Sequence, residues 1–316
     1  MWGGIAERTQ LEALDRRLNG PNGGTSREPP SDERFPHLLT FLHGLYPGRT
    51  YADAPKSYLA ALEPDLLGER LVEEVLGEDG GAQYLIDVCD AADPRALRQG
   101  FVVLGRIATR TGSPEAEDWL RRALDVDVPG RARAVFDAAL SLGLETAHGS
   151  IGLVLYEALK RDGTPELAGE LEPLLPDDTV SLREVAAWAT TRRLESLPLA
   201  AESGPEDLNE RARLLNNLGA RLSRLGRREE ALDVTLEAVR IHRILAQQRP
   251  EAFRAYLAGS LNNLGIALSE LGRREHALNA TEEAVQHYRA LVQQHHDAFL
   301  PELATSLTNL RAPIVD

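Results

Sequence analysis

The feature that most constrains this chain is a period of 46 residues in its C-terminal third. The motif LNNLG occurs at 215–219 and again at 261–265, and LGRRE occurs at 225–229 and again at 271–275. A looser copy of the first motif, SLTNL, follows at 306–310. Because a fixed period shared by independent motifs requires a repeated unit, the region predicts tandem copies of one supersecondary element.

Each copy has the pattern of two packed helices joined by a short turn. In the second copy Leu261 and Leu264 share one helical face, and Gly265 leaves room for a neighbouring helix. Gly272 in the turn suits the left-handed backbone that ends a helix. Small Ala277 is expected to face the Gly265 region. The stripe that the second helix should bury comprises Ala277, Leu278, Thr281, Ala284, Val285, Tyr288 and Leu291.

The remainder of the chain also reads as helices. No run alternates β-branched with polar residues, so no sheet is expected. A proline follows directly after Asp93, Ser113 and Thr164. In each pair the polar side chain can cap the first turn of a helix, and the proline suits the first helical position. Glycines at 112, 143 and 163 suit helix ends. These signals predict helices at roughly 94–111, 114–124, 129–142, 149–161, 165–174 and 181–194, after a candidate helix within 58–77.

Composition divides the chain into four parts. Residues 5–18 read as a short helix, and the following Gly- and Pro-rich stretch reads as a flexible linker. The parts are helix and linker over 1–34, a winged-helix-like remnant or helical connector over 35–92, degenerate helical repeats over 93–200, and the repeat array over 201–316. The predicted fold class is all-α: an α-solenoid of helix–turn–helix repeats preceded by an irregular helical domain.

Charge argues against two kinds of partner. The formal net charge is −14, most of it in residues 1–200, and no basic stripe or basic amphipathic helix occurs. We therefore expect neither nucleic acid nor a membrane surface as a partner. No secretory signal or long apolar span is visible, so the expected location is the cytoplasm. Ala and Leu are abundant and Arg greatly outnumbers Lys, which is typical of a GC-rich bacterial genome.

No recognisable catalytic or metal-binding motif occurs in the chain. HExxH, GxSxG and GxxxxGK[ST] are all missing, and no two of the eight histidines are four residues apart. The single cysteine, Cys89, lies in an apolar stretch and is expected to be a buried small side chain. We therefore expect a protein that is not an enzyme and that uses no cofactor or metal.

The repeated residues resemble tetratricopeptide repeats. The second copy carries their Leu-Gly…Ala…Ala spacing, and the first carries it at Leu215, Leu218, Gly219, Leu222, Ala231 and Ala238. The period exceeds the usual length of about 34 residues, so both helices look lengthened, as in the kinesin-light-chain-like variant with its LNNL signature. The third copy has Arg311 in place of the glycine and Pro313 soon after. It is expected to be truncated, and its exposed apolar surface to self-associate.

A second resemblance covers much of the remaining chain. YLAALEPDLLGE at 58–69 and LEPLLP at 171–176, followed by long repeats, resemble the region after the nucleotidase module of bacterial STAND-type, NLR-like signalling ATPases. The resemblance implies a ligand-sensing arm with a nucleotidase module upstream, in the same or a neighbouring chain. A stand-alone repeat scaffold or oligomerisation protein is the alternative, and an enzyme with a site hidden between helices is less favoured.

Candidate binding residues recur on the first helix of each repeat, which lines the concave surface of stacked helix pairs. They include Asn216, Asn217, Asn262, Asn263 and Asn309. Asparagine is a mediocre helix former, so its repetition in mid-helix calls for a reason. The amides could hold a peptide backbone, as the resemblance implies for the second Asn of each pair, or could form a ladder between repeats.

Three arginines complete the candidate groove. Arg213, Arg221 and Arg254 lie on the first helices of the first two repeats. Their guanidinium groups suit a protein or peptide ligand. The alternative is that each is simply solvated.

Overall fold

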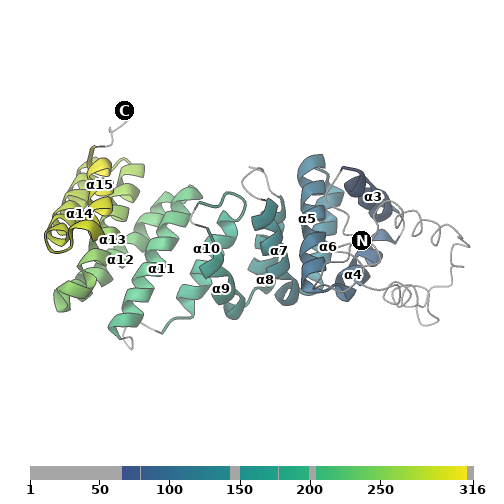
Figure 1. Cartoon of the computed structure of the whole chain (residues 1–316), viewed down its shortest axis with the longest axis horizontal. Helices are drawn as coiled ribbons and strands as arrows, with labels where there is room; N and C mark the ends of the chain where they lie inside the picture. The colour runs from purple at the N-terminus through teal and green to yellow at the C-terminus, as the bar shows by residue number, and fades with distance from the viewer. Residues whose placement is uncertain (1–65, 79, 143–149, 177, 199–203, 312–316) are drawn as a thin grey trace, which may run out of the picture. The chain divides into compact units, whose positions relative to one another are not determined.

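The computed structural model describes residues 66–78, 80–142, 150–176, 178–198 and 204–311. Within these ranges the chain is helical and contains no strand, which confirms the all-α prediction (Figure 1). The predicted helix at 5–18, the linker after it and Pro313 lie outside the described residues.

Two compact units make up the chain. The first contains residues 1–163 together with 178–182, and the second contains 164–177 together with 183–316. The four-part division inferred from the sequence stays a prediction. The helices of the first unit are α3 (Leu66–Gly77), α4 (Gly81–Ala91), α5 (Pro94–Thr111), α6 (Pro114–Asp125), α7 (Val128–Leu142) and α8 (Ser150–Asp162).

Helix boundaries in the first unit follow the capping signals of the sequence. The Asp93 carboxylate accepts hydrogen bonds from the backbone N–H groups of Arg95 and Ala96, which opens α5. Ser113 caps α6 in the same way, and Gly112 ends α5 in the left-handed conformation. A core of fully buried side chains lies among these helices, including Phe101, Leu104, Ile107, Leu120, Leu124, Phe136, Leu155 and Leu159. Cys89 is also buried, as expected.

The second unit is a tandem array. Its helices are α9 (Pro165–Leu171), a 3-10 turn (Glu172–Leu174), α10 (Arg183–Glu195), α11 (Pro205–Arg224), α12 (Arg228–Gln248), α13 (Pro250–Glu270), α14 (Arg274–Gln294) and α15 (His296–Arg311). Each helix from α10 to α14 packs against the next one in sequence (Figure 1). Helices α11 and α12 form the first repeat, α13 and α14 form the second, and α15 is the first helix of a third.

Glycine sets the close crossing within each repeat. A Cβ placed on Gly219 would lie 2.4 Å from the Thr235 hydroxyl oxygen, and one placed on Gly265 would lie 2.3 Å from that of Thr281. The backbone carbonyl of Ala277 is the next atom near Gly265, which confirms the predicted contact between these two regions. The two helices of a repeat therefore approach as closely as a glycine allows.

The turn within each repeat also needs glycine. Gly226 and Gly272 have φ values of 75° and 69°, in the region that other residues rarely adopt. Leu222 and Leu268 accept hydrogen bonds through their carbonyls from the residue after each of these glycines. Both turns therefore end the first helix of the repeat and redirect the chain in the same manner.

Candidate functional site

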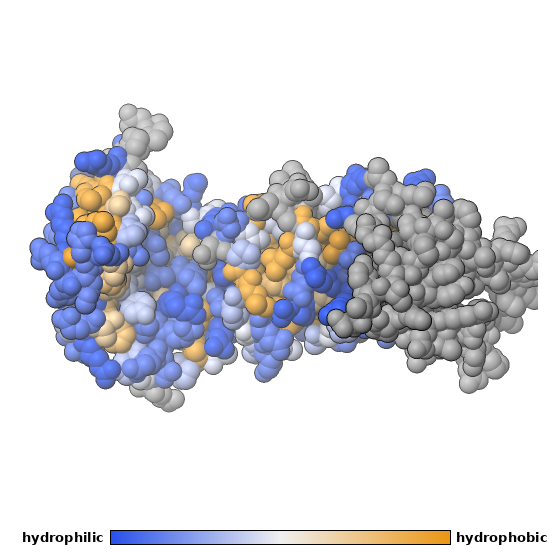
Figure 2. Space-filling model, in the orientation of Figure 1, coloured by the Kyte–Doolittle hydropathy of each residue, from blue (hydrophilic) through white to orange (hydrophobic). Residues whose placement is uncertain are grey.

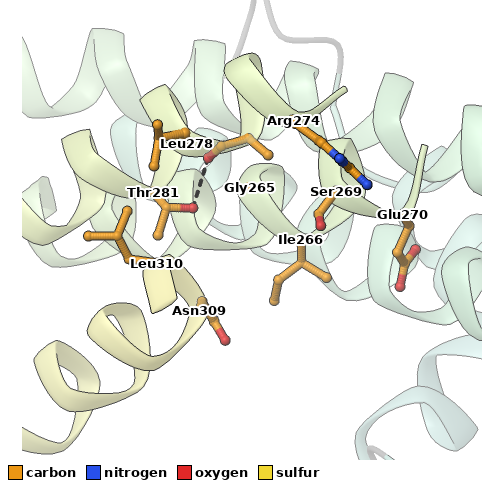
Figure 3. Close-up of a pocket in the computed structure, with 10 residues that line it drawn as sticks. Gly265, Ile266, Ser269, Glu270, Arg274, Leu278, Thr281, Asn309 and Leu310 are labelled. Carbon is orange, nitrogen blue, oxygen red and sulfur yellow. Dashed lines mark hydrogen bonds between the residues drawn. The ribbon is translucent and has the colours of Figure 1, made fainter. Parts of the chain in front are cut away.

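A pocket of about 250 Å³ lies between α13, α14 and α15 (Figure 3). Helix α13 contributes Ile266 and Ser269, helix α14 contributes Leu278, and helix α15 contributes Asn309 and Leu310. The remaining lining residues are Gly265, Glu270, Arg274, Ala277 and Thr281. The lining therefore combines aliphatic side chains with hydroxyl, charged and amide groups.

The corresponding space in the preceding repeat is filled. Leu232 and Leu264 occupy the positions 46 residues before Leu278 and Leu310, and they are 2% and 7% exposed. Leu278 is 47% exposed, so the prediction that it belongs to the buried stripe is wrong. Helix α13 covers Leu232 from the next repeat, whereas the end of α15 leaves Leu278 open on one side.

Polar groups around the pocket are held in place. The Thr281 hydroxyl donates to the Ala277 carbonyl at 2.9 Å (Figure 3). Asn309 donates through Nδ2 to Oδ1 of Asn262 at 3.1 Å. Glu270 accepts a hydrogen bond from the Ser223 hydroxyl of the preceding repeat. A pocket lined by aliphatic side chains together with polar groups held by hydrogen bonds suits one apolar side chain of a polypeptide ligand.

Part of the asparagine set joins neighbouring repeats. Asn216 donates through Nδ2 to the Ser260 hydroxyl at 2.6 Å, across the boundary between α11 and α13. The bond between Asn309 and Asn262 crosses the next boundary, between α15 and α13. These three side chains therefore act as inter-repeat contacts, in line with the ladder alternative.

The other two asparagines are placed differently. Asn217 and Asn263 are half-buried, and neither amide forms a hydrogen bond to another residue in the described part of the chain. They lie one position after Asn216 and Asn262, so their side chains leave the helix in a different direction. Their amides keep both donor and acceptor capacity for a ligand.

A buried polar network lies at the boundary between the first two repeats. His242 of α12 is 1% exposed, with Nδ1 2.6 Å from the Ser260 hydroxyl and Nε2 3.2 Å from Oδ1 of Asn209. The imidazole also stacks on Tyr256 with 5.7 Å between ring centroids. Burial lowers the pKa of His242 from 6.5 to about 4. Sequence reasoning missed this residue, and only its position in the buried stripe of α12 could have pointed to it.

The three candidate arginines have different environments. Arg221 is buried, so neither the groove nor the solvated interpretation holds for it. Its guanidinium donates to the Ala186 carbonyl at 3.1 Å and to the Thr190 hydroxyl, and it lies 3.5 Å from Glu172. The group ties α11 to α10 and the 3-10 turn.

The other two arginines lie nearer the surface. Arg213 is exposed and pairs with Glu210 through two hydrogen bonds of 2.8 Å. That pairing lowers the pKa of the Glu210 carboxyl. Arg254 is half-buried near His287. The structure therefore brings Arg213 and Arg254 to positions where a ligand could contact them, and removes Arg221 from the set.

Comparison with known families agrees with this repeat geometry. Residues 211–249 and 257–298 match the family model for the tetratricopeptide repeat. The matched segments lie in α11 to α14 and the start of α15, so this part of the array is similar to tetratricopeptide repeats, which indicate a protein–protein interaction module. None of the curated proteins compared with the chain matches it.

Within the described residues, neither a membrane-spanning helix nor a cluster of metal ligands occurs. None of their helices combines the length and the apolar character that crossing a bilayer requires. Within the same part of the chain, no group of three or more His, Cys, Asp or Glu side chains is placed to hold a metal ion.

Proposed function

We propose that the repeat array binds a polypeptide ligand that inserts one aliphatic side chain into the pocket between α13, α14 and α15. The observation that carries this proposal is the 47% exposure of Leu278 in the pocket, because the equivalent Leu232 of the preceding repeat is only 2% exposed. Burying such surfaces under a ligand side chain is favourable by about 25 cal/mol for each Å² covered. Asn217 and Asn263 would hold the ligand backbone beside the pocket.

The sharper proposal is that this array is the sensor arm of a STAND-type signalling protein. Its support is the match to tetratricopeptide repeats and the resemblance of 58–69 and 171–176 to the region after the nucleotidase module in those proteins. An upstream nucleotidase segment, encoded in the same or a neighbouring chain, is the genomic arrangement this proposal requires. If the coding sequence upstream of the chain contained no such segment, the proposal of a sensor arm would be wrong. The peptide-binding proposal would still stand, and the alternative of a stand-alone scaffold would take precedence.

Selection from a displayed peptide library tests the binding proposal. We expect the chain to enrich peptides with a shared aliphatic position, and Leu278→Glu to weaken their binding at least tenfold by placing a charge in the pocket. Leu236→Glu is a matched control, because Leu236 is 43% exposed on α12 and lies outside the pocket. Equal binding by all three proteins would show that the ligand does not use the pocket.

The amides are tested in the same assay. We expect Asn217→Ala together with Asn263→Ala to weaken binding without lowering the melting temperature, because neither side chain bonds to another described residue. A lowered melting temperature with unchanged binding would assign both asparagines to the repeat boundaries instead.

A further inference from the structure

One face of α15 is exposed along its whole length. Asp297, Leu300, Ala304, Thr308 and Arg311 recur at intervals of three or four residues and are all exposed. Leu300, the largest apolar side chain of this set, is 44% exposed. In Figure 2 apolar residues gather over α14 and α15 on the face turned to the viewer. The exposed stripe begins with a carboxylate, ends with a guanidinium and is uncharged between them.

The repeat symmetry shows that this kind of face is normally covered. Ala258 of α13 corresponds to Ala304, and it is fully buried against Tyr288 and Leu291 of the following helix. Helix α15 contacts α14 and α13 on its other side. Within the described residues, nothing occupies the place on α15 that α14 occupies on α13.

The glycine that permits the close crossing in the first two repeats is missing from α15. Arg311 stands 46 residues after Gly265, at the position where both repeats need a glycine. A Cβ at Gly219 or Gly265 would lie 2.4 Å or 2.3 Å from a threonine oxygen of the crossing helix. An arginine at this position therefore lacks the small size that permits the close crossing of the first two repeats.

We propose that the exposed face of α15 binds α15 of a second copy of this chain, antiparallel across a two-fold axis at Ala304. In this register each Asp297 faces the Arg311 of the other copy, and each Leu300 faces the methyl group of its Thr308. Ala304 meets its own symmetry mate and, having only a methyl side chain, lets the two helices approach closely. The two ion pairs form at opposite ends of the contact, and the apolar positions lie between them.

This surface is separate from the peptide pocket. The pocket uses Asn309 and Leu310 of α15, whereas the stripe uses Thr308 and Arg311, which leave the helix on its other side. The dimer therefore goes beyond the proposed function and does not depend on it. A single pair of 16-residue helices is small for a protein interface, so we expect a dissociation constant on the order of 10–100 µM.

Sedimentation equilibrium over a concentration series tests the dimer. We expect Ala304→Glu to weaken association at least tenfold, because it places two carboxylates against each other on the axis. Leu236→Glu in α12 introduces the same charge on an exposed leucine away from α15 and should leave association unchanged. A monomer at concentrations of about 1 mM, or equal association by Ala304→Glu, would overturn the proposal.

Charge reversal tests the antiparallel register. Asp297→Arg and Arg311→Asp should each weaken association, and the double variant should restore it to within about threefold, because each pair is re-formed with opposite polarity. If the double variant were as weak as the single ones, the register would be wrong.

A cysteine at the axis gives an independent readout. Ala304→Cys should form a disulfide-linked dimer under mild oxidation, because the axis brings the two sulfur atoms together. The native Cys89 is 4% exposed and gives little background. Glu302→Cys is the control, because Glu302 is exposed on the same helix but lies away from the axis. Equal cross-linking by the two cysteine variants would contradict the proposed contact.

Discussion

Single residues decide how closely the helices of this array can pack, and two glycines of α13 show the difference. Gly265 lies at the crossing with α14, whereas a Cβ on Gly259 would be 3.5 Å from the Tyr288 hydroxyl, an ordinary contact. The same glycine-to-alanine change should therefore have opposite effects at the two sites. We expect Gly265→Ala to lower the free energy of unfolding by about 2 kcal/mol through overpacking. Gly259→Ala should leave it unchanged or raise it by up to about 1 kcal/mol through helix propensity.

Urea denaturation measures both free energies. If Gly265→Ala were as stable as the unmodified chain, the two helices would not approach as closely as the glycine permits.

Two arginines of α11 that look alike in the sequence should differ in their contribution to stability. Arg221→Ala removes the guanidinium partner of the buried Glu172 carboxylate, so we expect a loss of about 3 kcal/mol. Arg213→Ala removes an exposed pair with Glu210 and should cost less than about 1 kcal/mol. Thermal and urea unfolding of the two variants provide the comparison. Similar losses for both would contradict the buried placement of Arg221.

Burial of His242 predicts a stability that depends on pH. Its pKa is about 4 in the folded chain against 6.5 for an ordinary histidine, so folding favours the neutral ring. This contribution is fully present above pH 6.5, and it is lost as the pH falls towards 4. The total loss is about 3 kcal/mol, from the difference between the two pKa values.

His242→Gln keeps a hydrogen-bonding side chain but cannot take up a proton, so its unfolding free energy should fall less between pH 7 and pH 4.5. Because other groups titrate in both proteins, the difference between them isolates His242. Identical pH dependence would mean that the imidazole is charged or solvated in the folded chain.

At the scale of helices, local signals predicted more than tertiary ones. Asp93 and Ser113 placed the starts of α5 and α6 correctly because a capping residue and a proline act within one turn. The period of 46 residues likewise predicted both repeats. The exposure of Leu278 could not be predicted, because it depends on the path that α15 takes relative to α14 and not on the pattern within α14.

The candidate site shows the same division between local and tertiary information. Asn216 and Asn217 are the same residue type at neighbouring positions. Only the packing of the next repeat gives Asn216 its hydrogen bond to Ser260. Arg221 was a candidate for the groove, with solvation as the alternative, because the sequence does not show that Glu172 and Thr190 lie beside it. Contacts with residues far along the chain therefore decided which candidates remained available to a ligand.

The boundary between α11 and α13 gives a prediction at this scale. Asn216→Ala removes the donor to Ser260, so we expect a loss of about 1 kcal/mol in unfolding free energy. Asn217→Ala, one residue later on the same helix, should change stability by less than half of that. Melting curves of the two variants distinguish them, and equal losses would mean that both amides serve the boundary.

The array as a whole behaves as a row of helices in which each element is stabilised by its neighbours. Helices α12 and α13 are packed on both sides, and the core between them contains Leu232, Val239, Leu257 and Leu261. Helix α15 is packed against α14 and α13, and its other face is exposed. Local opening should therefore be easiest at α15 and hardest at α12 and α13.

Native-state hydrogen exchange measures this gradient along the array. We expect amides of α12 and α13 to exchange only through global unfolding, and amides of α15 to exchange at least tenfold faster in dilute protein. If two copies associate through α15, its protection should increase as the protein concentration rises, because opening then requires dissociation first. Protection in α12 and α13 should not change over the same range. If α15 were protected as strongly as α13 in dilute monomer, the nearest-neighbour description of this array would be contradicted.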